Sequence, residues 1–303
     1  MYVEPEVSCL TFHLSNTIFI SGYSIILVLG LFLNVIALYF FFRLPELRSP
    51  TTIYMKNLAF TDLLLVCTLP LRIYYYTETN PILPQWLCRV TGILLLLNMY
   101  GSVFLLTGIS LDRCLAVCFP LRSKIFRDHV PWICTGLWVF NIICCVTFYY
   151  ITSKDNPTER CLCINEKPDF LMNSFATITS IVSGFLVPLG IMTVSSWALL
   201  KAVWRSQLAQ TGFVNKCKIV RMLVTNLTIF LVCFLPYHMV LLLYQILGSN
   251  RSLDDYYGVT LLVACCNAVL DPLAYYFASD TLQRTMVREM RLVGESEVSA
   301  EKV

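Results

Sequence analysis

The sequence predicts an all-α membrane protein: a bundle of seven transmembrane helices followed by a short amphipathic helix. Of its 303 residues, 57% are hydrophobic and only 14% are charged, whereas a soluble domain carries roughly 25% charged residues. Apolar runs of about 20 residues or more recur along the chain, without the period-two alternation of a membrane β-strand. Because a backbone in lipid must satisfy its own hydrogen bonds, only helices or closed barrels span a membrane, and these runs favour helices.

The apolar runs divide the chain into three regions. We expect an extracellular N-terminus at 1–17, a seven-span domain at 18–277, and an amphipathic helix with a short cytoplasmic tail at 278–303. The spans are expected at 18–42, 51–77, 86–118, 129–151, 171–204, 216–247 and 255–277. The segment 280–292 combines basic and apolar residues, which predicts a helix lying on the inner membrane surface.

The distribution of Lys and Arg predicts the orientation in the membrane. Most of these residues follow the odd-numbered spans, for example Arg122, Lys124 and Arg205. The positive-inside rule therefore predicts an extracellular N-terminus and a cytosolic C-terminus in a multi-pass protein of the plasma membrane. No Lys or Arg precedes the first span, so we expect that span to act as an uncleaved signal anchor.

The third expected span is the segment around which we expect the bundle to be organised. Between Val90 and Leu111 it has no Asp, Glu, Lys or Arg, and Asp112 and Arg113 follow directly. From Cys88 to Arg113 a helix would measure roughly 37 Å, enough to cross the ~30 Å hydrocarbon layer. A cysteine is thus expected at one membrane face and a charged pair at the other.

Polar residues and prolines interrupt the other spans as well. A polar side chain in lipid is expensive, so each one is a functional hypothesis by default. In chain order the interruptions are Asn34; Asp62, Pro70 and Arg72; Asn98 and Ser102; Trp138; Pro188; Pro236 and His238; and Asn267 and Asp271.

Covalent modifications are expected on the outer side. Cys9, Cys88, Cys161 and Cys163 fall there, in a compartment that permits disulfides. A bond from Cys88 to Cys161 or Cys163 would tie the loop before the fifth span to the third span, with Cys9 either bonded to the remaining thiol or free.

Asn250-Arg251-Ser252 is a sequon in the last outer loop, so the alternatives are a glycosylated Asn250 and an unmodified loop close to the membrane.

One landmark falls in each span, in order: GLFLN, NLAFTD, the cysteine with Asp112-Arg113, Trp138, Pro188, FLVCFLP and DPLAY. This ordered set resembles the rhodopsin-like (class A) G-protein-coupled receptors over about residues 18–292. TLPLRIYYY, LNMYGSVFLLTGISLDR and NAVLDPLAYYF further resemble the branch of purinergic and lysophospholipid receptors, above all lysophosphatidic-acid and lysophosphatidylserine receptors and their orphan relatives.

The resemblance implies a G-protein switch at the inner end of the bundle. Asp112 would hold Arg113 in the inactive state, and Arg113 would meet the G protein in the active state. Phe234 stands where a Trp is common, Pro236 would kink the sixth span, and Tyr275 would swing inward. Cys114 and Ser196 depart from the family pattern, since Tyr is common at both places.

The resemblance also implies an allosteric sodium ion as the one candidate metal, with no other cofactor. Asp62, Ser102, Asn267 and Asp271 match the family's positions around that ion. The alternative is a sodium-free hydrogen-bond network in which one carboxyl is protonated. In either case a mid-membrane carboxylate needs a cation or hydrogen-bond donors.

Arg72 is the main clue to the ligand. A guanidinium inside an apolar span is a natural anchor for a phosphate or carboxylate, and the resemblance implies a basic residue here in lysophospholipid receptors. The expected ligand-binding set is Arg72, Tyr75, Tyr76, Tyr100, Tyr237 and His238. The alternative for Arg72 is a structural pair with Glu78 or with the outer loop. Gly92 stands where nucleotide receptors carry a basic residue, which favours one anionic head with an apolar tail.

The sequence therefore predicts a cell-surface receptor that binds an anionic lipid and activates a heterotrimeric G protein, with the Rho-activating class as one expectation. Nucleic acid is not an expected partner, and no catalytic constellation indicates an enzyme. The alternatives are a nucleotide or small-acid receptor of the same family and, in a different class, a seven-helix transporter or proton pump with Asp62 and Asp271 as its relay.

Overall fold

The computed structural model describes residues 5–43, 49–78, 83–152, 174–205, 212–248 and 251–278. All regular elements in these ranges are helices, and seven segments are long and apolar enough to cross a membrane. These segments are Asn16–Arg43, Pro50–Thr77, Trp86–Cys118, Val130–Thr147, Ser174–Arg205, Val220–Leu247 and Leu253–Tyr276. The predicted fold class is confirmed, and the span boundaries agree with the prediction to within a few residues.

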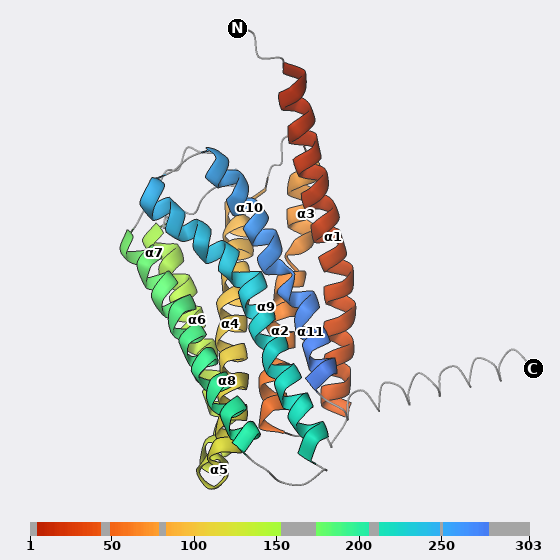
Figure 1. Ribbon diagram of the computed structural model, residues 1–303. Helices are drawn as coiled ribbons and strands as arrows, with labels where there is room; N and C mark the ends of the chain where they lie inside the picture. The colour runs from red at the N-terminus through yellow and green to blue at the C-terminus, as the bar shows by residue number, and fades with distance from the viewer. Residues whose placement is uncertain are drawn as a thin grey trace, which may run out of the picture.

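Four of the seven spans are single helices: α1 (Pro5–Arg43), α4 (Gln85–Cys118), α6 (Val130–Thr152) and α9 (Gly212–Leu247). Helix α1 begins before the predicted first span, and α9 continues through Pro236 without interruption. The short helix α5 (Pro120–Asp128) joins α4 to α6 at one end of the bundle (Figure 1). Helix α4 lies in the middle and packs against α2, α6, α8 and α9, as expected for the organising span.

The second and seventh spans are each broken into two helices. Helix α2 (Pro50–Val66) gives way to α3 (Leu69–Thr77) through Cys67 and Thr68. Pro70 has no N–H to donate to the carbonyl of Val66, so the first helix cannot simply continue. Helix α10 (Arg251–Cys265) passes into α11 (Asn267–Ala278) through a turn at Cys266. Both breaks lie close to the polar residues predicted to be functional.

The fifth span contains one turn of π-helix, η3 (Val182–Leu186), between α7 (Ser174–Ile181) and α8 (Val187–Arg205). It lies just before Pro188, whose missing N–H already disturbs the ladder of hydrogen bonds. Gly184 lies inside this turn, where a Cβ atom would lie 2.5 Å from Cε1 of Tyr100 on α4. The π-turn therefore brings the backbone of the fifth span directly against an aromatic ring of the third.

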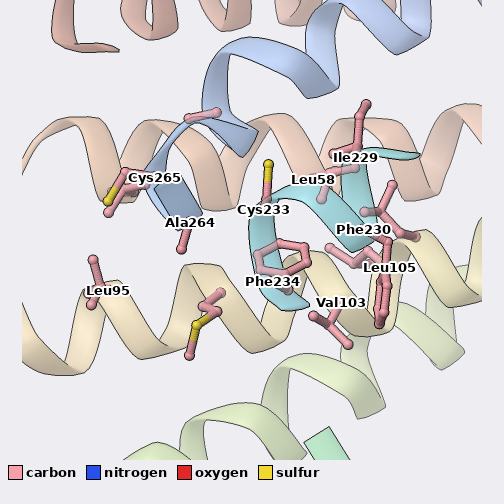
Figure 2. Packing of buried hydrophobic residues seen from close by; sticks show 14 of the residues in the cluster. Leu58, Leu95, Val103, Leu105, Ile229, Phe230, Cys233, Phe234, Ala264 and Cys265 are labelled. Carbon is pink, nitrogen blue, oxygen red and sulfur yellow. The ribbon is translucent and has the colours of Figure 1, made fainter. Parts of the chain in front are cut away.

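One continuous core fills the bundle. Figure 2 shows part of it, where Phe230, Cys233 and Phe234 of α9 lie between side chains of α2, α4 and α10. Phe230, Cys233, Phe234 and Leu58 have no measurable exposure. Apolar side chains on the outside, such as Phe32, Phe42 and Trp132, are 61–75% exposed, as expected for a surface that faces lipid.

Several predictions fall outside the described residues. These are the amphipathic helix at 280–292, the glycosylation of Asn250, and the choice of Cys161 or Cys163 as a disulfide partner. Cys88 itself is disulfide-bonded in the structure.

Candidate functional site

Arg72 lies in α3 and is only 3% exposed. Its Nε atom is buried and has no hydrogen-bond partner. Within the described ranges the only ion pair closer than 4 Å is Arg127–Asp112, so Arg72 does not form the alternative pair with Glu78. A buried charge without a counter-ion is costly, and an anion brought to this point would remove that cost.

Tyr23 on α1 and Tyr76 on α3 lie beside Arg72, and further aromatic rings pack on them. Its guanidinium carbon lies 5.9 Å from the ring centroid of Tyr23 on α1. Phe19 stacks on Tyr76 at 4.7 Å between centroids, and Tyr23 stacks on Tyr76 at 6.0 Å. The predicted Tyr75 packs edge-on against Tyr76, with centroids 5.4 Å apart. The prediction missed Phe19 and Tyr23, although their spacing of four residues places both on one helix face.

The rest of the predicted ligand set forms a second group, built from α4, α7, η3 and α9. The hydroxyls of Tyr100 and Ser180 are hydrogen-bonded. His238 donates from Nδ1 to the carbonyl oxygen of Phe234 at 2.8 Å, and its ring stacks on Phe185 at 4.6 Å. The Tyr100 and His238 rings meet edge to face at 6.1 Å.

Two polar atoms of this second group are buried without a partner. They are the hydroxyl of Tyr237 and Nε2 of His238. The Tyr237 ring lies 5.2 Å from the ring of His238 and 5.9 Å from that of Tyr257 on α10. The predicted residues thus divide into a cationic group beside α1 and an aromatic group beside α4 and α9.

A buried polar cluster connects α2, α4 and α11. Asn98 donates to Oδ1 of Asp62 at 2.9 Å, and Asn267 donates to Oγ of Ser102 at 2.9 Å. Oδ2 of Asp62, both carboxylate oxygens of Asp271 and Oδ1 of Asn267 are buried without partners. Asp62 and Asp271 are near enough to repel each other electrostatically.

These oxygens fit a hard monovalent cation. Two carboxylates, a hydroxyl and an amide carbonyl are the oxygen ligands that such an ion prefers, and a cation would relieve the repulsion between Asp62 and Asp271. Across the described part of the chain, no group of three or more His, Cys, Asp or Glu side chains could hold a metal ion. The predicted set, Asp62, Ser102, Asn267 and Asp271, has two carboxylates and so lies below that threshold.

Two of the predicted switch residues, Asp112 and Arg113, lie at the end of the bundle that carries α5, and no ion pair joins them. Oδ2 of Asp112 accepts a hydrogen bond from Thr51 at 2.6 Å, and Oδ1 accepts one from Nε of Arg127 at 3.3 Å. Nε of Arg113 is buried and has no partner. Thr51 and an arginine of α5 are thus hydrogen-bonded to the two oxygens of Asp112, and the role of Asp112 in holding Arg113 in the inactive state stays a prediction.

The other switch residues are packed into the core. Phe234 is fully buried, with its ring 5.8 Å from that of Phe230. Tyr275 on α11 is 2% exposed, its hydroxyl has no partner, and its ring lies 5.7 Å from that of Phe41. Pro236 lies within α9, one turn beyond Cys233.

Comparison with known proteins adds an independent finding. A family model described as "7 transmembrane receptor (rhodopsin family)" matches residues 33–275. Lysophosphatidic acid receptor 6 of Homo sapiens is 34% identical over 281 residues, covering 87% of this chain and 81% of the relative. Lysophosphatidic acid receptor 4 of Homo sapiens is 34% identical over 277 residues, covering 87% and 75%. Cysteinyl leukotriene receptor 1 of Mus musculus is 28% identical over 285 residues, covering 89% and 81%.

Proposed function

The chain belongs to the rhodopsin family of seven-transmembrane receptors, and on that premise we propose that it binds an anionic lysophospholipid between its helices and activates a heterotrimeric G protein. As a member of this family it is a multi-pass membrane receptor and not an enzyme. We further propose that its N-terminus is extracellular, because Lys and Arg follow the odd-numbered spans.

The observation that carries the ligand proposal is that Arg72 is buried without a carboxylate beside it in the described part of the chain. Its guanidinium is buried, and within the described ranges no carboxylate lies within 4 Å of it. Burial strengthens the attraction between this cation and a bound anion, because water no longer screens the two charges. The ligand therefore needs one anionic group that reaches Arg72.

The surroundings of Arg72 support a lipid over a nucleotide. Tyr23, Tyr76 and Phe19 offer aromatic surface beside a single guanidinium, which suits one anionic headgroup on an apolar molecule. A polyphosphate would call for further cations, and Gly92 on α4 supplies none. Several relatives are named for lysophosphatidic acid, which agrees with this choice.

Activation would then be a shift between two conformations. A ligand that binds one arrangement of the helices more tightly than the other favours that arrangement, and the G protein binds the same one. Arg113 would contact the G protein, and Phe234, Pro236 and Tyr275 would belong to the moving part. The unpartnered Nε of Arg113 leaves this side chain available for that contact.

We also propose that Asp62, Ser102, Asn267 and Asp271 hold a sodium ion. The support is the set of buried oxygens without partners on these residues. When bound, the ion would supply a positive charge that compensates the two carboxylates. The residues themselves connect α2, α4 and α11, so their packing is coupled to any rearrangement of these helices.

A ligand screen tests the proposed function. Cells expressing the chain are exposed to lysophosphatidic acid, to the matching monoacylglycerol that lacks the phosphate, and to nucleotides. G-protein dissociation is read for several G-protein classes, including the Rho-activating class. The proposal expects a response to the phosphate-bearing lipid alone. A response to nucleotides alone, or an equal response to the monoacylglycerol, would overturn it.

A further inference from the structure

Tyr23 on α1 places its ring beside the guanidinium of Arg72. Its side chain is 1% exposed, and its ring centroid lies 5.9 Å from the guanidinium carbon. The phenol of Tyr23 and the guanidinium of Arg72 also interact electrostatically. The phenol and the guanidinium therefore lie side by side between α1 and α3.

A stack of three rings fixes Tyr23. The ring planes of Phe19, Tyr23 and Tyr76 are inclined to one another by only 17–24°, with centroids 4.7–6.4 Å apart. Two of the rings come from α1 and one from α3, so the stack also holds the two helices together. Because the rings restrain one another, the Tyr23 hydroxyl and Arg72 are pre-organised for a bound group.

The charges around Arg72 indicate which kind of chemical group would bind beside it. Among the described residues, the titratable side chains that interact with its guanidinium are Tyr23, Tyr76, Tyr257 and Cys265, and all four are ordinarily neutral. None of them can act as a full counter-charge. A phenol can, however, accept from the guanidinium while it donates its own O–H to a third group. That third group has to be an acceptor, and an anion would gain most from two donors.

The second group of predicted ligand residues contains one buried hydroxyl without a partner, that of Tyr237, while its other donors are engaged. The Tyr100 hydroxyl is already bonded to Ser180, and Nδ1 of His238 is bonded to the carbonyl of Phe234. The rings of this group pack on one another through Phe185 and Phe230. The fixed positive charge that attracts an anion, Arg72, nevertheless lies beside α1 and not in this group.

We propose that Tyr23 binds the ligand's anionic headgroup together with Arg72, so that the headgroup is held where α1, α3 and α10 meet. This inference rests on the proposed function, because it assumes a ligand with a phosphate or carboxylate. Within that function it assigns a ligand contact to the first span. Tyr23 has two roles here: it donates its O–H to the anion and it restrains the guanidinium.

The experiment measures binding of lysophosphatidic acid and of the matching monoacylglycerol to the full chain in lipid nanodiscs. Tyr23→Phe keeps the ring stack and removes only the hydroxyl. We expect it to weaken lysophosphatidic acid binding by about tenfold, and to leave monoacylglycerol binding unchanged, because one hydrogen bond to a charged group is lost. Tyr39→Phe is the matched control on the same helix, since Tyr39 is 54% exposed on the outside of the bundle.

A double variant tests whether the two residues act on one group. In an Arg72→Ala background, Tyr23→Phe is expected to add little further loss, because residues that bind the same group are not additive. If Tyr23→Phe binds lysophosphatidic acid like the unchanged chain, the inference is wrong and the proposed function stands. If Tyr23→Phe weakens both lipids equally, the role of Tyr23 is structural and the inference is again wrong. If the unchanged chain prefers the monoacylglycerol, the proposed function fails and the inference fails with it.

Discussion

Arg127 donates from Nε to Oδ1 of Asp112 at 3.3 Å, so an arginine of α5 is bound to the carboxylate that precedes Arg113. The two residues are 15 positions apart in the sequence and belong to different helices. Thr51 on α2 occupies the other oxygen of the same carboxylate at 2.6 Å. Asp112 thereby links three helices, and Arg113 is left without this neighbour as a partner.

We predict that Arg127→Ala lowers nucleotide exchange in the absence of ligand. Without Arg127, the carboxylate of Asp112 is free to attract Arg113 and to hold it in place. The Arg127 side chain is 31% exposed, so screening by solvent limits the effect to about two- to fivefold. Arg122→Ala on the same short helix is the control. Equal exchange rates in the Arg122 and Arg127 variants would contradict the prediction.

We predict that Arg113→Ala blocks G-protein activation while ligand binding persists. Nε of Arg113 is buried without a partner. We propose that this side chain contacts the G protein and not the ligand. Nucleotide exchange stimulated by ligand is therefore expected to fall to the basal rate, with the dissociation constant of the ligand within about twofold of its original value. Normal stimulated exchange in this variant would refute the assigned role.

We predict that Arg72→Ala strongly weakens the response to an anionic lysophospholipid. The variant loses at least one hydrogen bond to a charged group, so the half-maximal concentration is expected to rise by about 10- to 100-fold. Arg72→Lys keeps the charge but loses the forked donors, and an intermediate shift is expected. Surface expression of all variants is measured in parallel. An unchanged dose response in Arg72→Ala would exclude this residue as the anchor.

We predict that replacing potassium with sodium at constant ionic strength raises the thermal unfolding temperature of the purified chain. Binding to the folded state alone stabilises it by about 1.4 kcal/mol when sodium is at ten times its dissociation constant. In Asp271→Asn this gain is expected to shrink, because one carboxylate is lost.

The same variant gives a second readout in potassium buffer. There Asp271→Asn is expected to be more stable than the unchanged chain, since two buried carboxylates no longer repel each other. The variant's effect on stability is thus expected to be less favourable in sodium than in potassium. Equal unfolding temperatures in sodium and potassium for the unchanged chain would contradict the proposed ion site.

The sequence predicted the number and type of elements because apolar length alone decides whether a helix can span lipid. It did not predict the breaks at Cys67–Thr68 and Cys266 or the π-turn at 182–186, although Pro70 and Pro188 signal disturbed helices nearby. A proline removes a hydrogen bond, but packing decides how the helix adjusts. Near a proline, a break between two helices and a π-turn differ only in local backbone geometry.

The charged residues of the candidate site could be predicted from the sequence, whereas its aromatic residues could not. Arg72, Asp62 and Asp271 could be recognised because a charge in an apolar span is conspicuous. Phe19 and Tyr23 were missed because aromatic residues are common near the ends of spans and carry no distinctive signal. The pairing of Arg127 with Asp112 was missed because it depends on how α5 folds back toward α4, which span lengths do not determine.

The last prediction concerns the contact between the fifth and third spans. A Cβ atom on Gly184 would lie 2.5 Å from Cε1 of Tyr100 and 3.0 Å from its Cδ1. The ring cannot move aside freely, because its hydroxyl is bonded to Ser180 and its edge meets His238. Gly184→Ala is therefore expected to destabilise the chain by about 1–3 kcal/mol through overpacking.

Gly190→Ala is the matched control in the same span, because nothing lies within 4 Å of a Cβ atom there. It is expected to be neutral or slightly stabilising, since Ala favours helix over Gly by up to about 1 kcal/mol. Tyr100→Leu is expected to recover part of the loss in Gly184→Ala, because the clashing ring is absent. Thermal unfolding is measured for the unchanged chain, Gly184→Ala, Gly190→Ala and the double variant Gly184→Ala/Tyr100→Leu. If Gly184→Ala is as stable as Gly190→Ala, the ring has room to move, and the π-turn is not what holds Tyr100 against the fifth span.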